Sequence, residues 1–139
     1  MDTTNILELP ENELERKLIE ISQKAMEKSY SPYSNFRVGA ALLTSEGKVY
    51  TGTNIENASF GATVCAERTA VIKAVSEGYI RFKAIAITSD SQSFIYPCGI
   101  CRQFLSEFDK GEMKVICSNK SGEYKSFKLI ELMPCIFEL

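Results

Sequence analysis

The chain has 139 residues, 45% of them hydrophobic and 24% charged, which is typical of one soluble globular domain spanning residues 1–139. Its formal net charge of −2 argues against a nucleic-acid partner, because proteins that bind a phosphate backbone usually carry a basic face. No apolar run reaches the length of a membrane span and the acidic N-terminal segment lacks the apolar core of a signal peptide, so we expect no membrane partner and a cytoplasmic location.

A helical pattern opens the chain and two strand patterns follow it. Apolar residues recur at helical spacing between residues 11 and 28, with charges between them, and predict the first helix. A polar, proline-containing stretch over residues 31–35 predicts a loop. Residues 36–43 and 48–54 then predict two strands joined by a hairpin turn.

The middle of the chain predicts a second helix and a buried strand. The helix is expected to run from near Val64 to Glu77, with Thr63 as its N-cap and Gly78 closing it. The apolar run at residues 83–88 is suited to a strand that is buried on both faces of a sheet.

The last third predicts four further short elements: a helix over residues 98–108, strands over 113–117 and 124–128, and a helical turn over 129–133. The element order is therefore αββαβαββα. Helices between strands imply crossover connections and partly parallel pairing. We therefore expect an α/β fold, a three-layer α/β/α arrangement around a mixed five-stranded sheet.

Three cysteines carry the chemistry in a chain that contains no histidine. The absence of histidine excludes Ser-His-Asp and Cys-His catalysis and histidine-ligated metals. Cys65, Cys98 and Cys101 can hold Zn²⁺ as thiolates and leave its fourth tetrahedral position open, which distinguishes a catalytic zinc from a structural one. Glu67, two residues beyond Cys65, supplies a carboxylate for proton transfer.

The predicted helices explain how these groups would meet. Cys98 and Cys101 are three residues apart at a helix start, so their sulfurs share a face, and Cys65 lies at the start of another helix. Helix N-termini favour thiolates through their free N–H groups and positive partial charge. Zn²⁺ bound by three thiolates carries a net charge of about −1. Arg68 is the expected hydrogen-bond donor that compensates this negative charge, and Arg102 is a weaker candidate.

The motif C-A-E at residues 65–67, followed by P-C-x-x-C at residues 97–101, resembles the zinc-dependent nucleobase and nucleoside deaminases. Five segments resemble the short, homotetrameric cytidine deaminases and extend the match over nearly the whole chain. Two of them contain the motifs above, C-A-E-R-T-A at 65–70 and P-C-G-I-C-R-Q at 97–103, and the others are N-F-R-V-G-A-A-L at 35–42, G-T-N-I-E-N-A at 52–58 and M-P-C-I-F at 133–137.

The resemblance implies one Zn²⁺ per subunit, a homotetramer, and hydrolytic deamination of cytidine and 2′-deoxycytidine in pyrimidine salvage. It implies Cys65, Cys98 and Cys101 as zinc ligands and Glu67 as the proton shuttle. The implied substrate contacts, including aromatic residues that approach a neighbouring subunit's site, are Phe36, Asn54, Glu56, Ala66, Phe60 and Phe137.

The sequence departs from that pattern at three positions. Tyr96 stands where serine or threonine usually precedes P-C-x-x-C, Ile100 replaces a usual alanine and could crowd the helix turn, and Phe60 lacks a tyrosine hydroxyl. None of these changes removes a catalytic group.

Three alternatives remain open from the residues. One is a deaminase acting on another cytosine-bearing compound, such as blasticidin S, and a second is deamination within nucleic acid, which the acidic balance disfavours. The third is a non-enzymatic module stabilised by zinc, or a redox C-x-x-C, and a structural zinc would need Cys117 or Cys135 as its fourth ligand. Otherwise we expect both of these cysteines to be buried, inert thiols.

Overall fold

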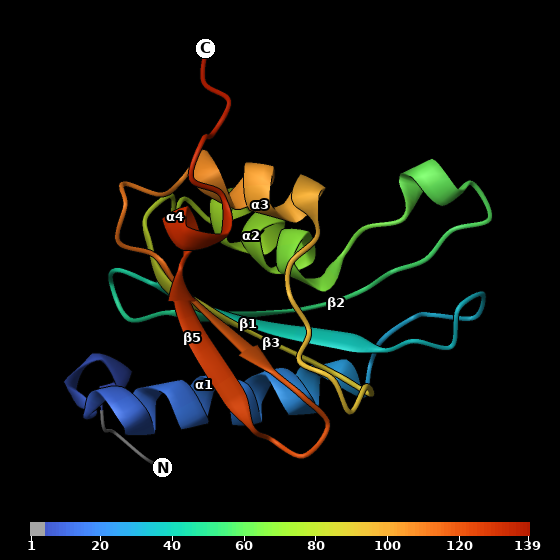
Figure 1. The fold of residues 1–139 in the computed structure, drawn as a ribbon, viewed down its shortest axis with the longest axis horizontal. Coiled ribbons are helices and arrows are strands. Elements are labelled where there is room, and N and C mark those ends of the chain that lie inside the picture. The colour runs from blue at the N-terminus through green and yellow to red at the C-terminus, as the bar shows by residue number, and fades with distance from the viewer. Residues whose placement is uncertain (1–4) are drawn as a thin grey trace.

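The computed structural model describes residues 5–139, and within this range a mixed sheet of five strands lies between layers of helices (Figure 1). The strand order is β2-β1-β3-β4-β5. The strands are β1 (Val38–Thr44), β2 (Val49–Thr53), β3 (Phe82–Ser89), β4 (Lys114–Ser118) and β5 (Tyr124–Lys128). The α-helices are α1 (Glu11–Met26), α2 (Ala66–Ser76), α3 (Gly99–Ser106) and α4 (Leu129–Leu132), and the 3-10 turns are η1 (Ile6–Glu8) and η2 (Phe60–Ala62).

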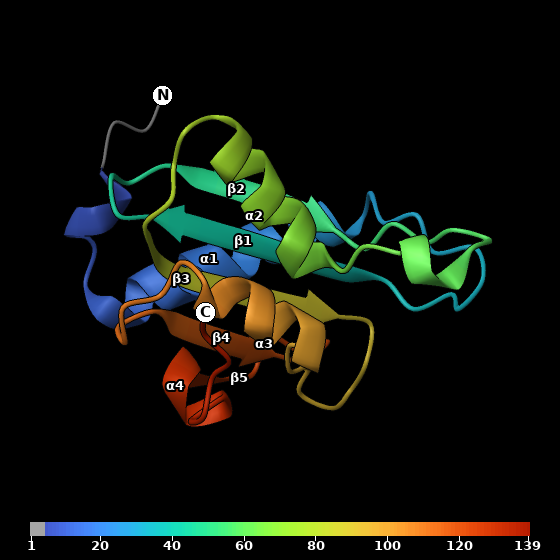
Figure 2. The ribbon, with the colours of Figure 1, turned by 90° about the horizontal axis from the view of Figure 1, so that it is seen from above.

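Helices cover both faces of the sheet. Helix α1 lies on one face, whereas α2, α3 and the short α4 lie on the other, as Figures 1 and 2 show from two directions. This arrangement confirms the predicted three-layer α/β/α fold, and every strand and α-helix that the sequence predicts is present.

The pairing of the strands explains why helix α3 lies where it does. Strand β1 pairs antiparallel with both β2 and β3, and β4 pairs antiparallel with β5. Strands β3 and β4 are parallel, and a parallel pair needs a crossover connection. Helix α3 is that crossover, and it therefore begins at the same end of the sheet as the segment that leads into α2.

Each face of the sheet has its own apolar core. Leu14 and Leu18 of α1 pack on one side, at positions that the helical pattern predicts. On the other side, Val71 of α2 and Leu105 of α3 pack against Ile85 and other strand residues. Burying one such side chain contributes about 1.5–3 kcal/mol, so the two cores fix both helix layers against the sheet.

The ends of helix α2 test two predicted caps. Gly78 has φ +97°, which only glycine adopts without strain, and the helix ends just before it as predicted. The N-cap prediction is wrong, because Cys65 and not Thr63 occupies that position. Thr63 instead accepts a hydrogen bond from the backbone N–H of Asn57, and the chain stays extended through Val64, which forms a β-bridge with Ile55.

Within residues 5–139, no helix combines the length and the apolar character needed to cross a bilayer. Residues 1–4, the start of the acidic N-terminal segment, lie outside the described part.

Candidate active site

Two helix N-termini bring the three predicted thiol ligands together. Cys65 is the N-cap of α2, Cys98 is the N-cap of α3, and Cys101 is the third residue of α3. Cys98 is exposed, Cys65 is half-buried and Cys101 is buried, so the group lies at the edge of the protein interior.

The three sulfur atoms lie within 4.8 Å of one another, and the distance from Cys65 Sγ to Cys98 Sγ is 3.8 Å. Tetrahedral zinc with Zn–S bonds of about 2.3 Å places two sulfurs about 3.8 Å apart. The spacing and the thiol chemistry of this set therefore fit Zn²⁺. Within residues 5–139, the cluster contains neither Cys117 nor Cys135, so no fourth cysteine completes a closed structural site in the described chain.

The environment concentrates negative charge on one of the sulfurs. Hydrogen bonding from Cys101, and then from Arg68, lowers the pKa of Cys65 to about 5 against the cost of burial. The same contact with Cys65, together with burial, raises the pKa of Cys101. Cys65 is thus held as a thiolate at neutral pH, and a thiolate is the form that binds a metal ion.

Glu67 is the second residue of α2 and is only 4% exposed. Burial is the main cause that raises its pKa to about 7, and the nearby Cys65 thiolate acts in the same direction. A carboxyl group with a pKa near neutrality can both accept and donate a proton during a reaction. Cys65 and Cys101 are among the groups that act on Glu67, so the first turn of α2 places its carboxyl group beside the sulfur cluster, although a spacing of two would put residues 65 and 67 on different faces in the middle of a helix.

The two arginines that follow the motifs have different partners. Arg68 Nη2 donates to Cys65 Sγ over 3.6 Å and to the Thr63 carbonyl over 3.4 Å. Arg102 Nε donates to the Pro97 carbonyl and its Nη1 to the Leu132 carbonyl, each over 2.8 Å. Arg102 is therefore committed to backbone carbonyls, and the suggestion that it compensates thiolate charge is not supported by its contacts.

Asn54 follows strand β2 and is buried, with its side-chain amide directed to the backbone where the chain enters β1. Its Nδ2 donates to the Phe36 carbonyl over 2.7 Å, and its Oδ1 accepts from the Val38 N–H over 3.0 Å and from the Ser29 hydroxyl. Asn54 thus fixes the chain on both sides of residue 37. Sequence reasoning missed this role, because nothing in the motif indicates which backbone groups the amide contacts.

Glu56 organises the loop that leads to Phe36. Its Oε1 accepts the backbone N–H groups of Tyr33 and Ser34 over 2.9 and 3.1 Å, and its Oε2 accepts the Ser34 hydroxyl. These bonds, the Ser34 hydroxyl first, lower the pKa of Glu56 below its usual range, so the carboxylate stays ionised. The two polar residues of N-I-E therefore hold one loop in place.

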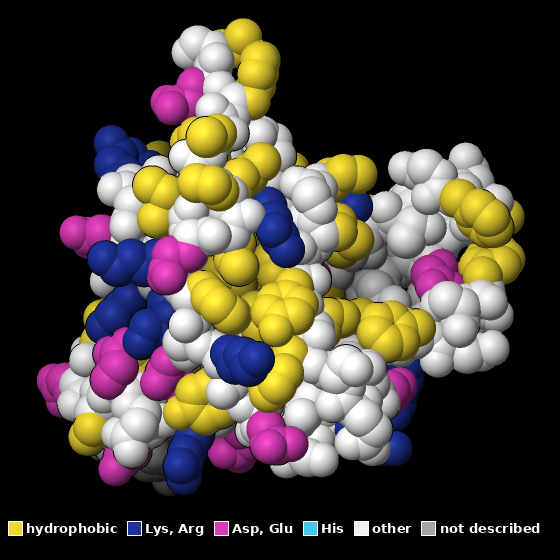
Figure 3. Space-filling view, viewed as in Figure 1, with side chains coloured by type: hydrophobic (Ala, Val, Ile, Leu, Met, Phe, Trp, Pro, Cys, Tyr) yellow, Lys and Arg dark blue, Asp and Glu magenta, His cyan; other side chains and the backbone are white. Residues whose placement is uncertain are grey.

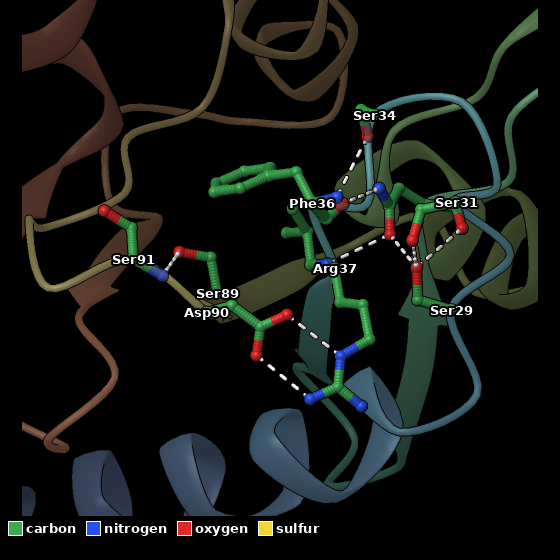
Figure 4. Close-up of polar contacts among 10 residues, drawn as sticks. Ser29, Ser31, Ser34, Phe36, Arg37, Ser89, Asp90 and Ser91 are labelled. Carbon is green, nitrogen blue, oxygen red and sulfur yellow. Dashed lines mark hydrogen bonds and ion pairs between the residues drawn. The ribbon is translucent and has the colours of Figure 1, made fainter.

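Phe36 lies two residues before β1, next to Arg37, whose ion pair with Asp90 ties the segment that enters β1 to the residue that follows β3. Arg37 donates through Nε and Nη2 to both carboxylate oxygens of Asp90, over 2.9 and 3.0 Å. In Figure 4 the ring of Phe36 points away from the segment that carries Ser29, Ser31 and Ser34. The sequence did not indicate the Arg37–Asp90 pair, because 53 residues separate its members.

The remaining aromatic candidates, Phe60 and Phe137, lie on two segments that project from the body of the protein, the loop that contains η2 and the C-terminal tail. Phe60 is 76% exposed on η2, where its ring meets Tyr33 edge to face, and Phe137 is 68% exposed on the C-terminal tail. Figure 1 shows these two segments extending from the body in different directions, and Figure 3 shows apolar side chains on both. A single chain therefore does not bring Phe60 and Phe137 together.

The structure places two of the residues that depart from the resemblance, Tyr96 and Ile100. The Tyr96 ring packs edge to face on Phe127 of β5. Ile100 is 65% exposed, so it does not crowd the turn of α3.

The two other cysteines differ from each other. Cys117 is fully buried in β4 and burial raises its pKa to about 12, which confirms an inert thiol. Cys135 is exposed, so the prediction of its burial is wrong; it lies on the tail beyond α4, which has little of its own chain to pack against.

Comparison with known proteins identifies the family. A model of the cytidine and deoxycytidylate deaminase zinc-binding region matches residues 12–118. This chain belongs to the cytidine and deoxycytidylate deaminase family. A cytidine deaminase of Sporosarcina psychrophila is 48% identical over 121 residues, which cover 87% of this chain and 89% of that protein. A probable cytidine deaminase of Dictyostelium discoideum is 49% identical over 128 residues, or 91% of this chain and 85% of that protein.

Solved structures of cytidine deaminases share the fold. The cytidine deaminase of Burkholderia pseudomallei has 43% sequence identity and a TM-score of 0.85, covering 93% of this chain and all (100%) of that one. The family match and the three-sulfur cluster together establish Zn²⁺ as the cofactor of this cytidine and deoxycytidylate deaminase family member.

Proposed function

We propose that this protein is a zinc-dependent cytidine deaminase. It converts cytidine or 2′-deoxycytidine and water to the corresponding uridine nucleoside and ammonia. The observation that carries the proposal is the cluster of three sulfurs within 4.8 Å of one another, with buried Glu67 on the same helix turn as one of them. Similarity to relatives named cytidine deaminase over most of their length supports the nucleoside as substrate.

Glu67 moves the protons in this reaction. Zinc bound by Cys65, Cys98 and Cys101 would polarise a water and lower its pKa towards neutrality. Glu67 accepts one proton from the attacking water and passes it to ring N3 as the water oxygen adds to C4. It then carries the proton of the new C4 hydroxyl to the exocyclic nitrogen, so that C4=O forms as the C4–N bond breaks and ammonia leaves. A pKa of about 7 suits both directions of transfer.

Other residues bind and orient the nucleoside. Ala66 is the first residue of α2, so its N–H has no intrahelical partner and is assigned to the base carbonyl. Phe36 packs against the pyrimidine. Asn54 and Glu56 bind the ribose hydroxyls, using the second Nδ2 hydrogen of Asn54 and the remaining lone pairs of Glu56. Arg68 compensates the charge of the thiolates.

The proposal extends to assembly and location. A single domain over residues 1–139 would form a homotetramer in which Phe60 and Phe137 complete the sites of neighbouring subunits, and their exposure supports this assignment. A role in pyrimidine salvage in the cytoplasm fits a site that depends on reduced cysteines, and all five cysteines are free.

An assay for uridine formation from cytidine, with and without a zinc chelator, tests the proposal. Cys98→Ser should remove most bound zinc and most activity together, since serine is a poor zinc ligand. Cys135→Ser is the matched control, because Cys135 is also an exposed cysteine but lies outside the cluster. A Cys98→Ser protein that keeps one zinc per chain and its full rate would contradict the assignment. Including blasticidin S among the substrates distinguishes a cytidine deaminase from a deaminase that acts on another cytosine-bearing compound.

A further inference from the structure

Gly52 of β2 lies against the first turn of α2 at a separation that no side chain permits. A Cβ atom at Gly52 would lie 2.2 Å from the Ala66 carbonyl oxygen and 2.6 Å from the Ala70 backbone nitrogen. Ordinary contacts begin near 3.4 Å, so the strand or the helix would have to move by about 1 Å. Both neighbours are backbone atoms, so a change of side-chain rotamer cannot relieve the clash.

The same contact joins the two halves of the site. On the helix side, Ala66 lies between Cys65 and Glu67, which belong to the metal and proton-transfer groups. On the strand side, Gly52 comes two residues before Asn54 and four before Glu56, which we assign to the sugar. A larger residue at position 52 would displace either β2 or α2. In both cases the distance between the sugar contacts and the reacting groups changes.

We propose that Gly52 is a positioning residue: it sets the spacing between the end of β2 and the first turn of α2, so that one nucleoside reaches the sugar contacts and the metal site together. This inference rests on the proposed function. Misplacement of reacting groups by about 1 Å can reduce a rate by about 10²-fold.

Gly39 of β1 offers a matched control on the other face of the sheet. A Cβ atom there would lie 2.1 Å from the Ser22 carbonyl oxygen and 2.7 Å from the Met26 nitrogen, both in the backbone of α1. Strand β1 is hydrogen-bonded on both sides, so α1 is the element that must move, and α1 carries none of the proposed site residues. Gly39→Ala therefore imposes a similar steric conflict without displacing α2.

The test compares Gly52→Ala with Gly39→Ala in the full-length protein. Both variants should lose stability in urea unfolding. With cobalt(II) in place of zinc, the ligand-field absorption reports the geometry of the three sulfurs independently of activity. If α2 moves, we expect Gly52→Ala to shift these absorption bands and to weaken zinc binding at least 10-fold in chelator competition. If β2 moves instead, we expect unaltered bands and a KM for cytidine that is raised at least 10-fold. Gly39→Ala should show neither change.

The proposal would be overturned if the Gly52→Ala variant matched the Gly39→Ala variant in cobalt spectrum, zinc affinity and cytidine kinetics. If Gly52→Ala does not fold, Ala70→Ser enlarges the same contact from the helix side, because a Cβ at Gly52 would lie 3.1 Å from Ala70 Cβ, and it should move the same readouts in the same direction. Failure of the unsubstituted protein to form uridine would instead reject the proposed function, while the cobalt spectra would still test the role of Gly52.

Discussion

Glu67 combines burial with a position at the start of α2, and this combination defines its expected role. Glu67→Gln keeps the shape of the side chain but removes proton transfer. We expect a folded protein with normal zinc content and a loss of at least about 10²-fold in turnover of cytidine. Metal analysis and steady-state kinetics check this result. A loss of zinc would show that Glu67 is a ligand and that its assigned role is wrong.

The raised pKa of Glu67 also predicts how stability depends on pH in the zinc-free protein. The pKa rises from 4.5 to about 7 because burial disfavours the charged form. The stability that the neutral form contributes is fully present below pH 4.5 and is lost as the pH rises towards 7. Compared with Glu67→Gln, the unsubstituted protein should lose up to about 3 kcal/mol of unfolding free energy across this interval. Urea unfolding at several pH values checks this, and parallel profiles would contradict it.

At the scale of single residues, sequence reasoning identifies groups better than it identifies their partners. The spacing of Cys98 and Cys101 at a helix start is sufficient to predict that their sulfurs share a face, whereas the addition of Cys65 to the cluster was implied by the family resemblance. The contacts of Asn54 with Phe36 and Val38 depend on how distant segments meet, which no local pattern encodes. The exposure of the tail cysteine was missed for the same reason.

At the scale of elements, Arg102 connects three segments. It lies on α3 and donates to the Pro97 carbonyl, next to Cys98, and to the Leu132 carbonyl at the end of α4. Arg102→Met keeps the length of the side chain and removes both donors. We expect a loss of about 1–3 kcal/mol in the free energy of unfolding, because hydrogen bonds from a charged donor are lost and partly buried carbonyls are left unpaired.

Arg81→Met provides the comparison for this prediction. Arg81 is exposed and, within residues 5–139, its side chain donates only to the carbonyl of its neighbour Ile80, so its replacement should change stability by less than about 0.5 kcal/mol. Urea unfolding of both variants measures the difference. Equal effects would mean that the contacts of Arg102 do not hold α3 and α4 together.

The elements that the sequence did not predict share a physical property. The 3-10 turns η1 and η2 each span three residues, too few to show a hydrophobic period. The N-cap of α2 was assigned to Thr63 because threonine favours that position, but the β-bridge between Val64 and Ile55 keeps the chain extended as far as Cys65. Tertiary pairing therefore displaced the helix start by two residues from the local preference.

At the scale of the whole molecule, the two projections make assembly testable. If Phe137 completes the site of a neighbouring subunit, Phe137→Ala should raise the KM for cytidine without changing zinc content, and dilution should lower activity as subunits separate. Leu139→Ala is the control, because Leu139 is a fully exposed apolar residue at the end of the same tail. Kinetics combined with light scattering check the prediction, and a fully active monomer would contradict it.

The origin of the sulfurs on two helices has a consequence for how the protein matures. Cys65 and Cys98 are 33 residues apart, and β3, which is hydrogen-bonded to both β1 and β4, lies between them in the chain. A chain emerging from the ribosome cannot present the complete ligand set until residue 101 has been synthesised and the centre of the sheet has formed. The complete three-sulfur geometry therefore arises only after β3 has joined the sheet, and zinc held by all three sulfurs marks a chain in which the starts of α2 and α3 have met.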